Sequence, residues 1–284
     1  MRHGMLSGLE RLAAVTALLQ RIRVEAPKSG VWEAADPQWW WRRPRATDEI
    51  QTPVWFDDDG LPVAAALLTD STQAWSLDLI RLPGLTLPFD DLARPALAQL
   101  DQREATVEAL VPVDDLELAA FYEEHGFARE DDVWSGWMPA SDRPAVAALP
   151  AGYRLVDRAG RGTPPHPMAG RNGPDVEARL RQTTLYDPRC DLAVLAPDDT
   201  VAGYALFWPD PLTGVGLVEP VRVEDAHAGR GIGYAMISAG LDRLAGAGAT
   251  TLKIGWESER AGELYTRLGF TDLQTLATYR RDVT

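Results

Sequence analysis

The sequence predicts an α+β protein built from two copies of one fold. Three observations support this prediction: a length of 284 residues, a repeat at an offset of 143 residues, and a difference in composition between the two halves. The length suffices for about two domains of ordinary size. With 45% hydrophobic and 25% charged residues, the chain has the composition of a globular protein with a substantial core.

The repeat is clearest where two helical segments end in the same pattern. Residues 121–127 read FYEEHGF and residues 264–270 read LYTRLGF, and each is followed by a strand-like tail. Two domain-sized copies indicate a duplicated fold and not a solenoid. We therefore expect domains at residues 1–140 and 152–284, joined by a proline-containing linker at residues 141–151.

The charge and the residue types exclude several classes of function. The net charge is −14, of which −13 lies in residues 1–142, and this argues against a protein that binds nucleic acid. The four histidines lie far apart, without the spacing of metal ligands. A single cysteine allows no internal disulfide and fits a reducing cytoplasm. The longest early apolar run is too short for a membrane span.

The second copy alternates between strand and helix patterns. Helices are expected at residues 232–247 and 258–268, the latter capped by Ser258 and ended by Gly269, and another helix is expected from Pro174 to residue 184. Residues 160–174 hold four prolines and four glycines and predict an irregular loop. Strands are expected at residues 153–157, 192–195, 201–208, 215–223, 250–256 and 274–283.

The first copy is less regular and is expected to open with a helix at residues 8–24. A tryptophan-rich stretch follows at residues 32–41, and its Trp39-Trp40-Trp41 run could line a substrate cavity or stack on a sugar or a cation. Packing is the favoured role for such a cluster. The remaining elements are expected as strands at residues 54–56, 63–68, 75–80 and 106–111 and helices at residues 89–100 and 116–125.

The strongest local signal is the glycine-dense turn of residues 224–233, EDAHAGRGIG, between a strand and a helix. Such a turn directs main-chain N–H groups and the positive end of a helix at one place, which favours an anion. It lacks the dinucleotide fingerprint, because Tyr234 stands where the last glycine would be. By itself the pattern also fits a tight connection without a ligand.

The strand, the turn ending in Arg230-Gly231-Ile232-Gly233, the helix, the next strand and Leu264-Tyr265-x-x-x-Gly269-Phe270 together resemble the GCN5-related N-acetyltransferase (GNAT) superfamily. The resemblance spans residues 152–284, and the first half resembles a degenerate second copy. The whole chain is therefore similar to tandem members of the superfamily, of which mycothiol synthase is one type. This implies two tandem acyl-CoA N-acyltransferase folds, each a mixed, mostly antiparallel sheet flanked by helices.

The resemblance also implies acetyl-CoA as the acyl-donor substrate, with no metal. It places the main chain of Val221 and Val223 on the pantetheine arm. Two positions depart from the family pattern, because Ala228 replaces Gln or Arg and Ser258 replaces Asn. The residues expected to bind the cofactor are Val221, Arg222, Val223, Ala228, Gly229, Arg230, Gly231, Ile232, Gly233, Tyr234 and Ser258.

Two residues are candidates for the proton transfers of amine acetylation. The resemblance makes Tyr265 the general acid beside the thioester sulfur, although Tyr122 in the first copy leaves a mere packing role open. Glu219 is the candidate base. Strand periodicity places it on the same face as Leu217 and Val221, and an apolar setting would raise its pKa. A salt-bridged or edge-exposed glutamate is the alternative, and Glu224, Asp225 and His227 are weaker candidates.

These observations predict an N-acetyltransferase that moves an acetyl group to the amine of a small molecule by direct transfer in a ternary complex. Only the second copy should bind acetyl-CoA, because the prolines of residues 82–88, LPGLTLP, remove N–H donors from the first. The acidic first half would favour a cationic acceptor. Two alternatives stay open: a non-catalytic acyl-CoA binding or sensing protein, and a scaffold with a degenerate acetyltransferase fold. Cys190 is expected to be a passive thiol.

Overall fold

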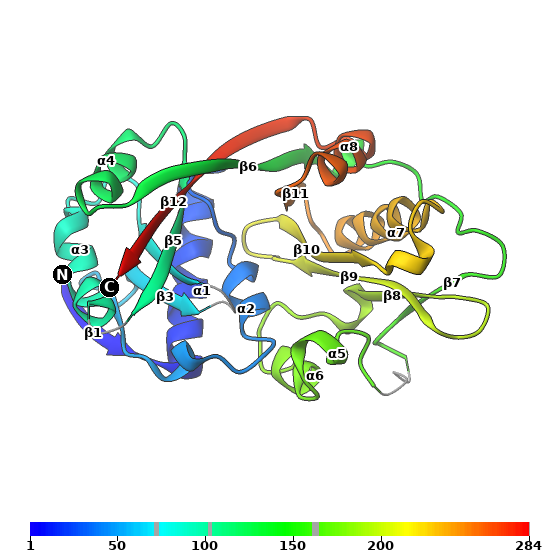
Figure 1. Ribbon diagram of the computed structural model, residues 1–284, viewed down its shortest axis with the longest axis horizontal. Helices are drawn as coiled ribbons and strands as arrows, with labels where there is room; N and C mark the ends of the chain where they lie inside the picture. The colour runs from blue at the N-terminus through cyan, green and yellow to red at the C-terminus, as the bar shows by residue number, and fades with distance from the viewer. Residues whose placement is uncertain (71–73, 102–103, 161–164, 284) are drawn as a thin grey trace. The chain divides into compact units, whose positions relative to one another are not determined.

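The computed structural model describes residues 1–70, 74–101, 104–160 and 165–283, which fold as two compact units (Figure 1). The first unit contains Met1–Pro37, Pro44–Val133 and Thr275–Thr284. The second contains Gln38–Arg43 and Trp134–Gln274. The sequence predicts contiguous domains, whereas these units exchange short segments of chain.

The sheet of the first unit runs in the order β1-β2-β3-β4-β5-β12. Only β4 and β5 are parallel, and the other neighbours are antiparallel. The expectation that this copy opens with a helix is wrong, because a strand precedes it; the exposed outer edge of this strand gives little apolar pattern. The strands are β1 (Arg2–Leu6), β2 (Thr52–Phe56), β3 (Pro62–Asp70), β4 (Trp75–Arg81), β5 (Ala105–Pro112) and part of β12 (Asp272–Val283).

The sheet of the second unit runs in the order β6-β11-β10-β9-β8-β7. Again one neighbouring pair is parallel, here β10 and β11. The strands are part of β6 (Ala128–Pro139), β7 (Arg154–Asp157), β8 (Asp191–Leu195), β9 (Val201–Pro209), β10 (Val215–Val223) and β11 (Thr251–Trp256). The two units therefore share one strand order and one position for the parallel pair, as a duplicated fold requires.

The last strand of each sheet comes from the other half of the sequence. In the first unit, Leu276–Val283 of β12 pairs with β5. In the second unit, the end of β6, from Trp134 to Pro139, pairs with β11. Strand pairing of this kind depends on long-range contacts, so the period of the apolar residues does not reveal it.

The helices confirm most of the expected positions. The expected loop of residues 160–174 contains the short helix α5, and residues 161–164 lie outside the described chain. The helix expected up to residue 184 ends at Leu180. The helices are α1 (Gly8–Glu25), α2 (Ala35–Trp40), α3 (Phe89–Leu100) and α4 (Leu116–Glu124) in the first half, and α5 (Ala169–Asn172), α6 (Val176–Leu180), α7 (Ile232–Gly246) and α8 (Glu259–Leu268) in the second.

Helix α7 forms the core of the second unit by packing on β8, β9 and β10, with α5 and α6 on the other side of the sheet (Figure 1). Ile237, Leu241 and Leu244 are fully buried, as their common face predicts. Each such side chain stabilises the fold by about 1.5–3 kcal/mol through burial. In the described chain, no helix combines the length and the apolar character needed to cross a membrane.

The segment expected to be a linker is fixed on α7. The N–H of Ala147 donates to Ser238 Oγ at 3.0 Å, and the Arg143 guanidinium bonds Asp242 Oδ1 at 2.9 Å. These contacts explain why residues 141–151 belong to the second unit.

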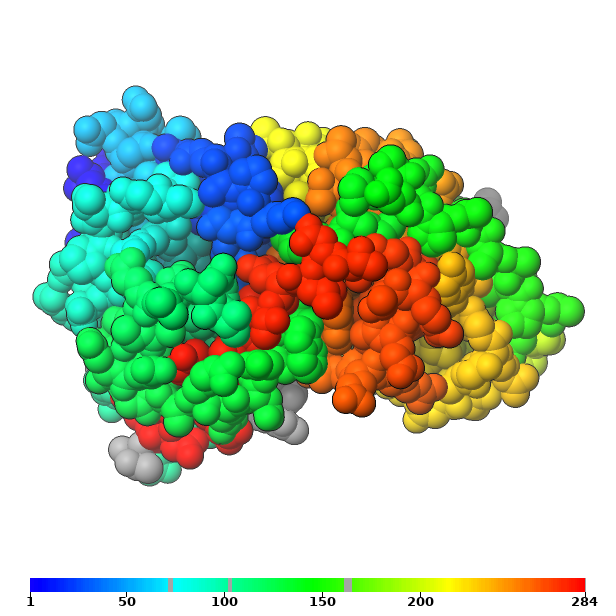
Figure 2. Space-filling model, turned by 90° about the horizontal axis from the view of Figure 1, so that it is seen from above, coloured from blue at the N-terminus to red at the C-terminus, as the bar shows by residue number. Residues whose placement is uncertain are grey.

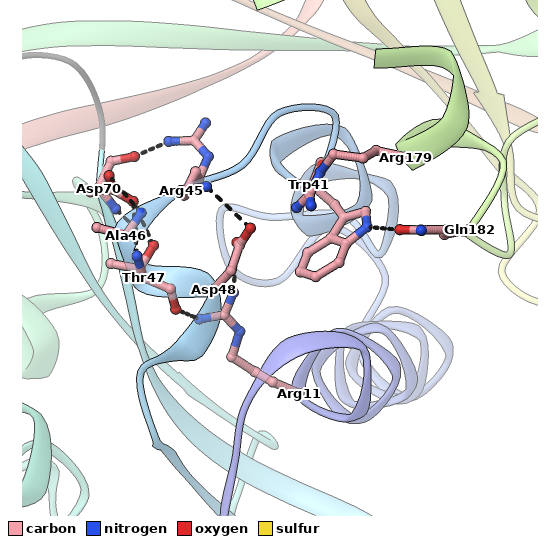
Figure 3. Close-up of polar contacts among 9 residues, drawn as sticks. All are labelled: Arg11, Trp41, Arg45, Ala46, Thr47, Asp48, Asp70, Arg179 and Gln182. Carbon is pink, nitrogen blue, oxygen red and sulfur yellow. Dashed lines mark hydrogen bonds and ion pairs between the residues drawn. The ribbon is translucent and has the colours of Figure 1, made fainter. Parts of the chain in front are cut away.

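The tryptophan run packs, as the sequence favours. Trp39 and Trp41 are buried, and Gln38–Arg43 belongs to the second unit. The Trp41 indole N–H donates to Gln182 Oε1 at 2.8 Å, and the Arg179 guanidinium lies 3.9 Å above the indole ring (Figure 3). A short piece of the first half of the sequence thus completes the second unit beside α6.

Candidate active site

The parallel pair of the second unit is short, and this leaves one edge of β10 unpaired. β10 pairs with β11 only along Val215–Val218. Beyond Val218, β10 continues beside β9 alone, whereas β11 continues beside β6. We call the side of residues 219–223 that faces away from β9 the open edge of β10.

Main-chain groups of Val221 and Val223 point to this open edge. The N–H of Glu224 donates to the carbonyl of Ala202 on β9 at 2.9 Å. Because the groups of an antiparallel strand alternate in direction, those of Val223 and Val221 point away from β9. In the described chain they have no hydrogen-bond partner, so an extended ligand could add there like a further strand.

Glu219 lies at a bulge, where the register between β10 and β9 shifts. Its carbonyl accepts a hydrogen bond from the Trp208 indole at 2.7 Å. The sequence predicts that Glu219 and Leu217 share a face of the strand with Val221, and this prediction is wrong. The bulge adds one residue to β10, so that Val218 lies on the same face as Val221. The bulge directs the carboxylate of Glu219 to a position that the simple period of two does not give.

The turn before α7 presents a run of free amides. Among the described residues, the N–H groups of residues 229–234 donate to no acceptor, and the first helical bond runs from Ala235 to the carbonyl of Gly231. Gly229 and Gly231 hold φ angles of 75° and 80°, which side chains disfavour. Six consecutive amides at a helix N-terminus form an anion site.

Only some of the charged side chains around the turn favour binding of a polyanion. Arg230 is exposed and makes no ion pair within the described residues. The Arg222 guanidinium, by contrast, lies 3.3 Å from Asp225 and 3.7 Å from Glu224. Ala228 is exposed and carries no polar side chain. The sequence did not single out Arg171, which holds Glu224 through bonds of 2.7 and 2.9 Å and lowers the pKa of that carboxyl.

Helix α8 carries the predicted general acid, Tyr265. Ser258 caps the helix by accepting from the N–H of Ala261, and Gly269 ends it with a φ of 109°, as predicted. The outer face of α8 lies at the surface of the second unit (Figure 2). Tyr265 is on the inner face, 8% exposed, with its ring 5.7 Å from that of Trp256.

The Tyr265 hydroxyl is electrostatically coupled to Glu219. Burial, and secondly the charge of Glu219, raise the pKa of Tyr265 to about 12. The phenol therefore carries its proton throughout the physiological range. Within the described chain its hydroxyl has no hydrogen-bond partner. Tyr265 therefore lies close enough to Glu219 for the charge of the carboxylate to act on its hydroxyl.

The other candidates have different surroundings. His227 Nδ1 lies 3.0 Å from the Tyr153 hydroxyl, and the side chain of Asp225 is almost wholly exposed. Burial raises the pKa of the Cys190 thiol to about 11, which agrees with a passive thiol. Glu219, Tyr265 and the amides therefore remain the candidate groups of this region.

One buried polar cluster of the second unit was not predicted. His166 Nε2 lies 2.8 Å from Asp191 Oδ2, and the Tyr186 hydroxyl donates to the same oxygen at 2.8 Å. The N–H of Met168 donates to His166 Nδ1, so the ring is neutral with its proton on Nε2. The cluster fastens the loop before α5 to β8. No group of three His, Cys, Asp or Glu side chains in the described ranges could hold a metal ion.

Comparison with known proteins gives a family model and a fold. Residues 163–270 match the model of the acetyltransferase (GNAT) family. A tandem GNAT protein from the clavulanic acid biosynthesis pathway superposes with a TM-score of 0.67 at 19% identity, covering 100% of this chain and 98% of the other. Residues 163–270 are therefore similar to the GNAT family, and the whole chain has the fold of a tandem GNAT protein. Its two units are two GNAT folds, each with a mixed, mostly antiparallel sheet.

Other proteins show the same similarity. The GNAT protein of Sphaerobacter thermophilus covers 99% of this chain and 96% of its own at a TM-score of 0.60 and 17% identity. A mycothiol acetyltransferase of Tsukamurella paurometabola is 42% identical over 124 residues, which is 40% of this chain and 42% of the relative. Another, of Kineococcus radiotolerans, is 34% identical over 50% of this chain and 44% of the relative. The chain thus matches less than half the length of either curated relative.

Proposed function

We propose that the protein is an N-acetyltransferase that transfers the acetyl group of acetyl-CoA directly to the amine of a small molecule. The observation that carries the proposal is the run of free amides at residues 229–234, next to a strand whose open edge holds Glu219. The amides and Arg230 would bind the pyrophosphate. Val221 and Val223 would bind the pantetheine arm through their main chain, with Ser258 at the start of α8 completing the site.

The proposed transfer uses two side chains and the main chain. Glu219 takes a proton from the acceptor ammonium, and the free amine forms a bond to the thioester carbon. The oxyanion receives a hydrogen bond from a main-chain N–H near Val221. The carbon–sulfur bond then breaks, Tyr265 donates its proton to the departing thiolate, and the phenolate so formed takes the second proton of the reacting nitrogen, which leaves a neutral amide. The raised pKa keeps that proton on Tyr265 until the thiolate forms.

The acceptor is proposed to be a small amine, and a cationic one is favoured. Two curated relatives are called mycothiol acetyltransferases, which supports an amine of low molecular weight. Residues 1–142 carry a net charge of −13, which would attract a cation. The single, buried Cys190 suits a reaction in the cytoplasm.

Turnover with a panel of small amines tests this function. The purified chain is mixed with acetyl-CoA and cationic, neutral or anionic amines, and the release of free thiol is followed. Steady release with a cationic amine, reduced in Tyr265→Phe, is the expected result. Saturable binding of acetyl-CoA without any turnover would favour the sensing protein, and no binding would favour the scaffold.

A further inference from the structure

The first unit contains a cavity of about 250 Å³ at the position where its own parallel pair separates. β4 pairs with β5 only at Trp75 and Ser76, so residues 77–81 leave the neighbouring strand. The cavity is lined by β4, by the turn after it, and by side chains of α1, α4 and the segment before α2. Most of these are apolar, among them Leu19, Ile22, Val31, Leu79, Phe89 and Leu110.

One buried acid lies among these side chains. Asp78 is 4% exposed, and its Oδ1 accepts a hydrogen bond from the Trp32 indole at 2.8 Å. Its Oδ2 is buried and has no hydrogen-bond partner within the described residues. A buried carboxyl oxygen without a donor destabilises the fold, so a ligand that supplies a donor would be stabilising.

The other charged groups of the cavity are already engaged. Asp115 caps α4 by accepting from the N–H of Leu118. Glu117 forms an ion pair with Arg81, whose guanidinium also donates to the carbonyl of Leu87 and lies over the Phe89 ring. The remaining acid, Asp78, forms no ion pair within the part of the chain that the structure describes. Asp36 lies close enough to add a further negative charge to its surroundings.

We propose that this cavity binds a small organic cation, an ammonium with a compact apolar body. The ammonium would donate to Asp78 Oδ2, and the apolar body would fill the space between Leu79 and Leu110. The site is separate from the proposed acetyl-CoA site, and it does not depend on acetyl transfer.

The ionisation of Asp78 makes this binding depend on pH. Burial and Asp36 raise the pKa of Asp78 to about 7, against the Trp32 hydrogen bond, which lowers it. A cation prefers the carboxylate, so its affinity rises as the pH rises from 6 to 8. The titratable groups facing Asp78 are few: Asp36 and Tyr122 act on it directly, and Arg81, Asp115 and Glu117 line the same cavity.

Calorimetric titration of the full chain tests the proposal with phenethylammonium and its neutral isostere 2-phenylethanol as probes. At pH 8 we expect one saturable site that binds the ammonium at least about tenfold more tightly than the alcohol. Asp78→Asn should weaken the ammonium by about tenfold or more. Asp131→Asn removes an exposed acid of the same unit and should change nothing.

Three further measurements locate the site if Asp78→Asn folds poorly. Leu110→Phe fills the cavity and should abolish binding, and the wild-type affinity should fall between pH 8 and pH 6. The indole N–H resonance of Trp32, assigned with Trp32→Phe, should shift on binding. Absence of saturable binding, equal affinity for both probes, or affinity that survives Leu110→Phe would overturn the proposal.

Discussion

The open edges of β10 and β4 occupy the same position in two copies of one fold, yet they have different surroundings. Each strand is parallel to its neighbour for only two to four residues and then separates from it. Around β10, amides and a phenol have no hydrogen-bond partner among the described residues. Around β4 the chain leaves a cavity with one buried carboxyl. The two copies thus share a scaffold and differ at a few positions beside these strands.

The helix that follows the open edge shows the difference in electrostatics. In the second unit, α7 has no acidic residue in its first turn, and the turn before it holds Gly229 and Gly231. In the first unit, α3 has Pro88 at its N-cap and the acids Asp90 and Asp91 in its first turn. Those carboxylates already use the positive end of the helix and would repel a phosphate.

Tyr122 and Tyr265 occupy equivalent positions in the two copies, but their hydroxyls have different surroundings. The Tyr122 hydroxyl donates to the carbonyl of Leu77 on β4 at 2.7 Å, so it is part of the core. The Tyr265 hydroxyl has no such bond among the described residues. A tyrosine at this place is therefore available for proton transfer in the second copy alone.

The largest expected effect concerns Asp78, the buried acid in the cavity of the first unit. Because its folded pKa, about 7, lies above the unfolded value near 3.8, the folded first unit binds the extra proton between these pH values. Its stability should therefore fall as the pH rises through that window, by on the order of 3 kcal/mol between pH 5 and pH 8. Hydrogen exchange of the β3 and β4 amides measures this, and Asp78→Asn should remove the pH dependence. A pH-independent wild type would contradict the assignment.

The tyrosine pair should separate catalysis from packing. Tyr265→Phe removes the proton donor and should lower kcat by about 10²-fold with little change in KM for acetyl-CoA. Tyr122→Phe loses only a core hydrogen bond, about 1 kcal/mol of stability, with normal turnover. Steady-state kinetics beside thermal denaturation distinguish the two. Similar kinetic losses in both variants would mean that the open edges are not functionally different.

The carboxylates of β10 and of the turn after it can be separated in the same way. Glu219→Gln should lower kcat/KM by about 10- to 10²-fold and flatten the acidic limb of the pH–rate profile. Glu224→Gln breaks a surface pair with Arg171 and should cost less than about 1 kcal/mol of stability, with turnover close to normal. The reverse order of losses would transfer the role of base to Glu224.

The smallest expected effect concerns the N-caps of the equivalent helices α8 and α4. Ser258 caps α8 and Asp115 caps α4, each by accepting from the N–H three residues on. Replacing either by alanine should cost about 1 kcal/mol of stability. Ser258→Ala should also weaken acetyl-CoA by a few-fold, because Ser258 lies in the proposed site, whereas Asp115→Ala should not. Denaturation curves and acetyl-CoA titrations of the two variants provide the check.

Local patterns in the sequence predicted local structure well. Helix α3 begins at Phe89 and ends at Leu100 as expected, and α8 has the predicted cap and end. The periodicity of α7 identified its buried face. Such features depend on neighbours a few residues apart, which a single sequence contains.

Long-range features were beyond the sequence. The exchange of β6 and β12, the place of Gln38–Arg43 in the second unit and the edge strand β1 all depend on pairing across many residues. The site was predicted as a set of positions. The bulge at Glu219, the ion pair of Arg171 and the empty space beside Asp78 arise only when separate segments meet.

We propose that one copy alone binds acetyl-CoA, because only that copy has the amide turn. Calorimetric titration of the full chain with acetyl-CoA measures the number of sites. Gly231→Glu places a carboxylate among the amides, whereas Gly84→Glu makes the same change at a glycine of equal conformation, φ 78° against 80°, in the first copy. We expect one acetyl-CoA site per chain, with binding lost in Gly231→Glu and retained in Gly84→Glu. Two sites per chain, or binding that survives Gly231→Glu, would contradict it.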